Sequence, residues 1–122
     1  MKTTFTVRLS SADAHYADRL VSGAKVLEFF GDAATELLIR KDGDEGMFRA
    51  YESVEFLAPV RAGDFLQIDA EIVHVGNTSR KIKFSASKFI EAKPNSNNPH
   101  AASLLQQTVV CVTALGTCVV KK

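Results

Sequence analysis

The sequence predicts an α+β fold in which an antiparallel sheet of about five strands wraps around one long helix. Three observations predict it: one long helical segment, alternating segments on both sides of that helix, and turn residues that join the later segments. A chain of 122 residues can build one core around such a sheet. We therefore expect a single domain over residues 1–122.

The helix is expected to run from about Leu20 to Lys41. Capping side chains lie around its expected start, between Asp18 and Ser22, and the run Asp42-Gly43-Asp44-Glu45-Gly46 ends it. Its apolar residues form two neighbouring stripes, which is wider than a helix on a surface needs. The stripes are Leu20, Ala24, Leu27, Ala34 and Leu38 beside Val26, Phe30, Ala33 and Leu37. We expect a curved sheet to enclose this helix.

The strands are predicted from segments rich in apolar and β-branched residues, several of which alternate with polar ones. They are expected at residues 3–9, 48–57, 64–75, 80–92 and 108–120. The turn residues Gly76-Asn77-Thr78-Ser79 make the third and fourth strands antiparallel neighbours. The polar residues 93–99 are expected to form an exposed loop. This order of elements is that of the hotdog fold, whose sheets usually pair across a dimer.

Composition and charge exclude several classes of function. The apolar content of 46% and the charged content of 24% are typical of a soluble globular protein, and no apolar run could span a membrane. Residues 1–11 lack the apolar region of a secretory signal, so we expect a cytoplasmic protein. The net charge of +1 gives no general attraction to nucleic acid or membranes. No metal site is expected, because His74 and His100 have no partner at ligand spacing.

Cys111 and Cys118 are expected to be free thiols that pack in the last strand. They lie seven residues apart, and an odd separation in a regular strand directs two side chains to opposite faces. An intrastrand disulfide is therefore not expected. Free thiols also suit a reducing compartment.

Acid–base side chains lie directly before the predicted helix, in the segment Asp13-Ala14-His15-Tyr16. Gly23 and Ala24 have no bulk, and backbone N–H groups at a helix start can stabilise an anionic oxygen on a thioester carbonyl. The alternative is that Gly23 makes only a tight contact between helix and sheet, with His15 a solvated loop residue. Spacing alone leaves both interpretations open.

Asp32 and Glu36 lie one helical turn apart and share a face, so they could bring two carboxylates to one substrate. They also belong to a polar stripe in which Glu36 and Arg40 are spaced as an ion pair. A solvated helix face explains the same pattern.

The turn between the third and fourth strands combines backbone donors with nearby cations, Arg80, Lys81 and Lys83. This combination suits the binding of phosphate groups. Basic residues on an exposed strand can also serve solubility alone.

Several segments, in order along nearly the whole chain, resemble one enzyme family. They are Asp13-Ala14-His15-Tyr16, residues 20–25, 30–37, 42–44, 54–60, 62–65 and 75–81, and the ending Gly116-Thr117-Cys118-Val119-Val120. Together they resemble the 3-aminobutyryl-CoA and β-alanyl-CoA ammonia lyases. The segments that begin at Asp13 and Phe30 carry most of the resemblance, since the others are general to acyl-CoA hotdog proteins. The chain departs from the family at Ala17-Asp18-Arg19, where Gly-Gly-Asn or Thr-Gly-Asn is expected.

The resemblance implies the hotdog fold, an acyl-CoA substrate and a homodimer or higher homo-oligomer. It also implies no cofactor, since CoA is part of the substrate. The implied reaction is the reversible elimination of ammonia from 3-aminobutyryl-CoA, or a similar 3-aminoacyl-CoA, to give crotonyl-CoA, as in lysine fermentation. The alternatives are a hotdog thioesterase, an enoyl-CoA hydratase and a non-catalytic acyl-CoA-binding module.

Three groups of site residues follow from these patterns together with the resemblance. The catalytic candidates are His15, Asp32 and Glu36, with the choice of base left open. Gly23 and Ala24 are expected to bind the thioester oxygen. The expected CoA contacts are Gly76, Asn77, Ser79, Arg80 and Lys81.

Overall fold

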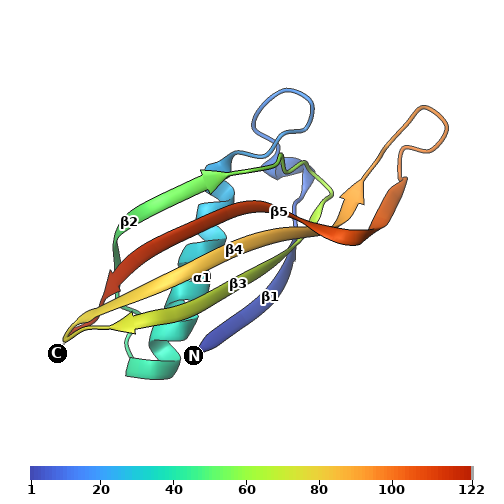
Figure 1. Ribbon diagram of the computed structural model, residues 1–122. Helices are drawn as coiled ribbons and strands as arrows, with labels where there is room; N and C mark the ends of the chain where they lie inside the picture. Colours follow the sequence, from blue (N-terminus) through green and yellow to red (C-terminus); the bar gives the residue numbers. More distant parts are fainter. Residues whose placement is uncertain (122) are drawn as a thin grey trace.

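The structure is a computed structural model that describes residues 1–121. Its sheet contains β1 (Lys2–Arg8), β2 (Met47–Phe56), β3 (Phe65–Val75), β4 (Ser79–Ala92) and β5 (Ala102–Val119). The long helix α1 (Gly23–Asp42) lies against one face of this sheet, and a short 3-10 turn, η1 (Ser11–Asp13), follows β1 (Figure 1). The predicted hotdog arrangement of one long helix against a five-stranded antiparallel sheet is confirmed.

The strands lie in the order β1-β3-β4-β5-β2, and every neighbouring pair is antiparallel. The predicted hairpin between β3 and β4 is present. The two edges of the sheet differ in chemistry. At the β1 edge the exposed side chains are polar, whereas Met47 and Phe56 at the ends of β2 are 73% and 59% exposed.

The helix begins at Gly23, three residues later than predicted. Leu20 and Val21 are extended instead, because they form bridges with Arg61 and Ala14 from other parts of the chain. The side chain of Ser22 caps α1, and the helix ends at Gly43 in the left-handed conformation (φ 66°), which glycine adopts without strain.

One face of α1 is buried against the sheet. The buried residues are Val26, Phe30, Ala33, Ala34, Leu37 and Leu38. Phe30 stacks on Phe84 of β4 with 5.0 Å between the ring centroids. Of the apolar stripe that begins at Leu20, Ala24 is exposed and Leu27 is half-buried, so the sheet of one protomer does not enclose the whole apolar surface of the helix.

Cys111 and Cys118 both lie in the core as free thiols, so the prediction that they face opposite sides is wrong. The reason is a β-bulge. Val112 pairs with Ala86 whereas Val110 pairs with Ser87, which makes Cys111 an extra residue in β5. The bulge reverses the alternation, and burial raises the pKa of Cys118 to about 11.

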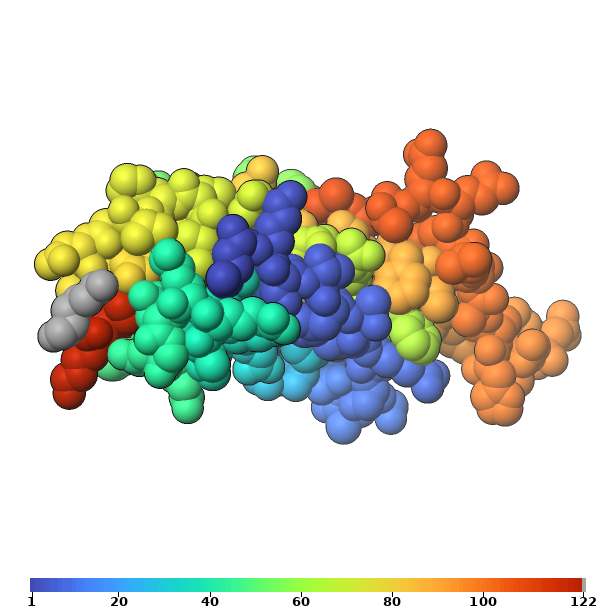
Figure 2. All heavy atoms as spheres, turned by 90° about the horizontal axis from the view of Figure 1, so that it is seen from below, coloured from blue at the N-terminus to red at the C-terminus, as the bar shows by residue number. Residues whose placement is uncertain are grey.

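The end of β4, the start of β5 and the loop between them form an arm that projects from one end of the molecule (Figures 1 and 2). The loop is exposed, as predicted. β5 begins at Ala102, six residues earlier than expected, and its register with β4 shifts between Val109 and Leu104. This shift bends the arm away from the main sheet.

A buried ion pair lies at the base of the arm. Lys88 Nζ is 3.0 Å from Asp64 Oδ2 and donates to the carbonyl oxygen of Pro59 at 2.9 Å. The Asp64 carboxylate also accepts the backbone N–H groups of Arg61 and Ala92. The pair therefore ties the segment before β3 to the end of β4.

Candidate functional site

The start of α1 lies between two cavities of different character. An apolar cavity of about 380 Å³ includes Tyr16, Leu20, Gly23, Phe56 and Val60 in its lining. A polar cavity of about 390 Å³ is lined by Ala12, Asp13, His15, Ser22, Ala24, Lys25 and Glu28. Ser22 and Ala24 line both. A ligand at the helix start would contact apolar groups on one side and ionisable groups on the other.

The two predicted donors to a thioester oxygen differ in availability. The N–H of Ala24 donates to Ser22 Oγ at 3.2 Å, so the helix cap already occupies it. The N–H of Gly23 has no acceptor among residues 1–121. The Phe56 ring lies so close to Gly23 that a Cβ would overlap it. Gly23 thus makes a tight contact between helix and sheet and also offers a free backbone N–H donor.

His15 is held beside the helix start by its backbone, whose N–H donates to the carbonyl oxygen of Leu20 at 2.8 Å. Its imidazole is exposed, lines the polar cavity and contacts the Tyr16 ring edge-on, with 4.7 Å between centroids. This placement leaves the ring accessible to a bound substrate.

Lys25 lies in the polar cavity between two carboxylates. Its Nζ is 3.3 Å from Glu28 Oε1 and 3.6 Å from Asp13 Oδ1, and the hydrogen bond to Glu28 raises the pKa of Lys25. The Ser10 backbone N–H donates to Asp13 and lowers the pKa of that carboxyl, which makes it a weaker base. Lys25 and Glu28 are not among the candidate site residues predicted from the sequence, although both follow within five residues of Gly23.

Asp32 and Glu36 lie farther along the helix and line none of the cavities at its start. The 12 positions from Ala24 to Glu36 correspond to about 18 Å of helix. Glu36 Oε2 accepts hydrogen bonds from Thr3 Oγ1 and Arg40 Nε, both at 2.8 Å, and these lower the pKa of Glu36. One protomer therefore does not bring these carboxylates together with His15.

The turn predicted to bind CoA is held by internal hydrogen bonds. The N–H of Gly76 donates to the carbonyl oxygen of Ser79 at 2.8 Å. Arg80 is 2% exposed, and its guanidinium donates to both Asp42 oxygens and to the carbonyl oxygens of Gly76 and Ser79. Arg80 thus stabilises the turn from inside, and these hydrogen bonds occupy its buried guanidinium.

The remaining residues of this turn are more accessible. Asn77 is exposed, and Lys81 is partly exposed, with its Nζ 2.6 Å from Glu52 Oε1. The turn lies at the end of the molecule where α1 ends, opposite the helix start (Figure 1). Since the 20 residues of α1 span about 30 Å, the two predicted parts of the site are well separated within one protomer.

Two features are absent from the part of the chain that the structure describes. Within residues 1–121, no group of three or more His, Cys, Asp or Glu side chains is placed to hold a metal ion. None of the helices there is long and apolar enough to cross a membrane.

Comparisons with known proteins agree on the family. Residues 19–87 match the profile of the family described as "Thioesterase superfamily". Over all 122 residues the chain is 50% identical to 3-aminobutyryl-CoA ammonia lyase of Acetoanaerobium sticklandii and covers 96% of that protein. It matches the solved structure of β-alanyl-CoA:ammonia lyase from Clostridium propionicum with a TM-score of 0.95 and 36% identity, covering 100% of this chain and 86% of that one.

A more distant match shows the fold alone. The chain matches a hexameric hotdog fold thioesterase of Campylobacter jejuni with a TM-score of 0.76 and 19% identity, over 97% of this chain and 81% of that one. The resemblance to the ammonia lyases is confirmed by the two closer matches. The chain belongs to the hotdog proteins of the thioesterase superfamily and, within them, to the family of the 3-aminobutyryl-CoA and β-alanyl-CoA ammonia lyases.

Proposed function

We propose that this protein is a carbon–nitrogen lyase that reversibly eliminates ammonia from 3-aminobutyryl-CoA, or a similar 3-aminoacyl-CoA, to give crotonyl-CoA. The observation that carries this proposal is the 50% identity to a 3-aminobutyryl-CoA ammonia lyase across the whole chain. The helix start supports it, because an apolar cavity suits a short acyl chain and an adjacent polar cavity suits a charged amine.

In the proposed reaction a base removes a proton from the carbon next to the thioester. The negative charge moves onto the thioester oxygen, where the free N–H of Gly23 can donate a hydrogen bond. A preorganised donor of this kind lowers the activation barrier of the reaction by about 3 kcal/mol. The carbon–nitrogen bond then breaks, the electron pair leaves with nitrogen as ammonia, and ammonia takes up the abstracted proton. The chemistry is redox-neutral and calls for no cofactor besides the CoA of the substrate.

His15 is the best placed of the three catalytic candidates to accept the proton, because its ring lines the polar cavity at the helix start. The lowered pKa of Glu36 makes it a weaker base. A carboxylate that stays ionised is instead suited to hold the substrate ammonium. We assign His15 to the proton and Glu36 or Asp32 to the amine.

This assignment needs a second protomer, and the β2 edge is suited to provide it. Met47, Phe56 and Leu57 expose large apolar side chains along that edge. Pairing β2 with the same strand of a second copy, antiparallel about a two-fold axis, would set the Phe56 end beside the partner's Met47 end. The helix start of one protomer would then approach the later turns of the partner's α1, where Asp32 and Glu36 lie.

The same pairing would bring the turn at Gly76, Asn77, Ser79 and Lys81 toward the helix start of the other protomer. We therefore keep these four residues as proposed CoA contacts. A location in the cytoplasm and a role in amino-acid degradation such as lysine fermentation complete the proposal. The two free, buried thiols suit that compartment.

The test is to mix the purified protein with crotonyl-CoA and ammonium and to follow enoyl absorbance and free thiol together. A lyase lowers the absorbance only when ammonium is present and releases no thiol. Release of thiol would identify a thioesterase, and loss of absorbance without ammonium would identify a hydratase. If neither signal changes, the protein is a binding module and the proposal is wrong.

A further inference from the structure

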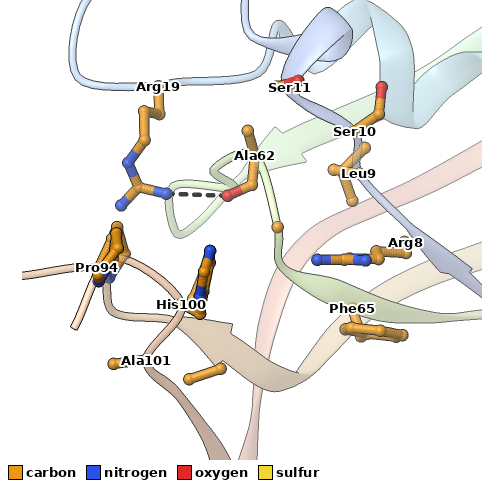
Figure 3. A pocket seen from close by; sticks show the side chains of 14 residues that line it. Arg8, Leu9, Ser10, Ser11, Arg19, Ala62, Phe65, Pro94, His100 and Ala101 are labelled. Carbon is orange, nitrogen blue, oxygen red and sulfur yellow. Dashed lines mark hydrogen bonds between the residues drawn. The ribbon is translucent and has the colours of Figure 1, made fainter.

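A third cavity, of about 640 Å³, lies outside the site described above. It is enclosed by the end of β1, the loop at Arg19, the segment before β3 and the arm (Figure 3). Its lining contains no carboxylate but three groups that carry or can carry positive charge, Arg8, Arg19 and His100. Figure 3 shows all three directed toward the same space.

The two arginines of this cavity have no acidic partner. Of the six arginines, Arg40, Arg61 and Arg80 form ion pairs. Among residues 1–121, no carboxylate lies within 4.0 Å of the other three, Arg8, Arg19 and Arg49. Two of these three line one cavity. Arginines that share a cavity without a counterion attract an anion that can accept several hydrogen bonds.

Both guanidinium groups are held in place by contacts that leave donors free. Arg8 lies over the Phe65 ring, 5.4 Å from its centroid. Arg19 uses one nitrogen to donate to the carbonyl oxygen of Ala62 at 2.9 Å. Preorganised donors lose little conformational entropy when a ligand binds, which favours affinity.

The backbone at Arg19 adds an independent observation. Asp18 and Arg19 have φ values of 60° and 59°, in a turn closed by the Leu20 N–H and the carbonyl oxygen of Ala17. Glycine and asparagine are the usual residues in such a turn, because a larger side chain is strained there. Residues held in such conformations cluster at active sites and ligand-binding sites.

We propose that this cavity binds the phosphate groups of a nucleotide-sized ligand through Arg8, Arg19 and His100. Its volume falls within the range of small-molecule sites, about 300–1,000 Å³, and apolar residues such as Leu9, Phe65 and Pro94 complete its walls. Two sources supply this chemistry: the nucleotide end of a CoA thioester, or a free phosphorylated molecule. The first rests on the proposed function, and the second does not.

The nucleotide end of CoA is the first source to test, because this cavity lies next to the apolar cavity at the helix start. Residues 19–21 pair with residues 60–62 through the N–H groups of Val21 and Ala62. Leu20 and Val60 line the apolar cavity at the helix start, while Arg19 and Ala62 line this one. A long thioester seated at the helix start therefore has a basic cavity beside it in the same protomer.

The experiment compares the full-length protein with the double variant Arg8→Gln/Arg19→Gln. Arg49→Gln is the matched control, since Arg49 is also unpaired but lines a different cavity. Calorimetry measures binding of adenosine 3′,5′-bisphosphate, and kinetics measure KM for crotonyl-CoA and for crotonyl-pantetheine, which has no nucleotide. We expect the double variant to bind the bisphosphate at least about tenfold more weakly and the control to bind it normally.

The kinetic arms separate the two sources. A KM that rises for crotonyl-CoA but not for crotonyl-pantetheine identifies the nucleotide end of CoA. Lost bisphosphate binding with unchanged KM values identifies a free phosphorylated ligand. If the protein shows no lyase activity but binds the bisphosphate through the arginines, the proposed function fails while this inference stands.

The inference is overturned if the parent protein does not bind the bisphosphate, or if the double variant binds it equally well. Arg19→Gly is a second variant that controls for misfolding of the double variant. It removes the cation and at the same time relieves the strain of the left-handed conformation. We expect this variant to melt no lower than the parent and yet to bind the bisphosphate more weakly. Unchanged binding by a folded Arg19→Gly protein would also count against the site.

Discussion

Gly23 combines a close contact with a free backbone donor, and a larger residue at its position would displace the Phe56 ring. The Phe56 ring occupies the space that a Cβ would need. We expect Gly23→Ala to lower the free energy of unfolding by about 1–3 kcal/mol through overpacking. Chemical denaturation measures this change. Adding Phe56→Ala should restore part of the loss in a double-mutant cycle. Additive effects of the two changes would show that the contact is not the cause.

Cys118 predicts how stability changes in alkaline solution. Burial raises its pKa to about 11, whereas an unfolded thiol ionises near pH 8.5. A folded pKa above the unfolded one contributes stability that is present below about pH 8.5 and is lost as the pH rises toward 11. Denaturation at pH 7.5 and pH 9.5 should show a smaller decrease for Cys118→Ala than for the parent. Equal decreases in the two proteins would contradict the buried, neutral thiol.

Some residue positions could be predicted from the sequence, and others depend on distant partners. Gly43 ends the helix as its Asp-Gly surroundings predict, because the left-handed cap is a local property. Arg80 follows a turn, and its neighbours indicate a basic surface. Its burial depends on Asp42, 38 positions away, which no local pattern reveals.

The helices and strands likewise divide into those that a local pattern predicts and those that depend on distant parts of the chain. The apolar and alternating segments placed β1, β2, β3 and β4 to within one residue at each end, and in β1 and β3 the alternation follows directly from having one buried face. Leu20 and Val21 continue the apolar spacing of the helix, but their bridges to Arg61 and Ala14 keep them extended. The bulge at Cys111 and the early start of β5 depend on pairing with β4. Long-range pairing overrides periodicity in these places.

The Asp64–Lys88 pair at the base of the arm gives a prediction at the element scale. Lys88→Met would leave the buried Asp64 carboxylate without its cation, which typically costs about 3–5 kcal/mol of stability. Lys83→Met is the matched control, because Lys83 is an exposed lysine on the same strand. Urea unfolding should separate the two variants clearly. Equal stabilities would mean that the pair does not secure the arm.

For the whole molecule, the sequence predicts candidate site residues but not where they lie relative to one another. His15 lines the cavity at the start of α1. The turn between β3 and β4 lies at the other end of the helix (Figure 1). The apolar β2 edge and the apolar residues Ala24 and Leu27 that the sheet leaves partly uncovered both favour a partner, and neither pattern identifies its geometry from one chain. The basic cavity escaped sequence analysis for the same reason, since Arg8, Arg19 and His100 come from three separate segments.

In the proposed mechanism His15 of one protomer accepts the proton, and Glu36 of the other, or Asp32 in its place, holds the amine. His15→Gln and Glu36→Gln should each fold and dimerise while kcat falls by about 10²- to 10⁴-fold. Both losses are measured as ammonium-dependent loss of crotonyl-CoA absorbance.

Mixing the two inactive variants after reversible dissociation tests this claim most directly. In a mixed dimer one of the two sites then has both residues intact. Since half of the dimers are mixed, about a quarter of the parent activity should return. If His15 and Glu36 act within one protomer, or if either is dispensable, mixing restores nothing beyond the average of the two variants, and the account is contradicted.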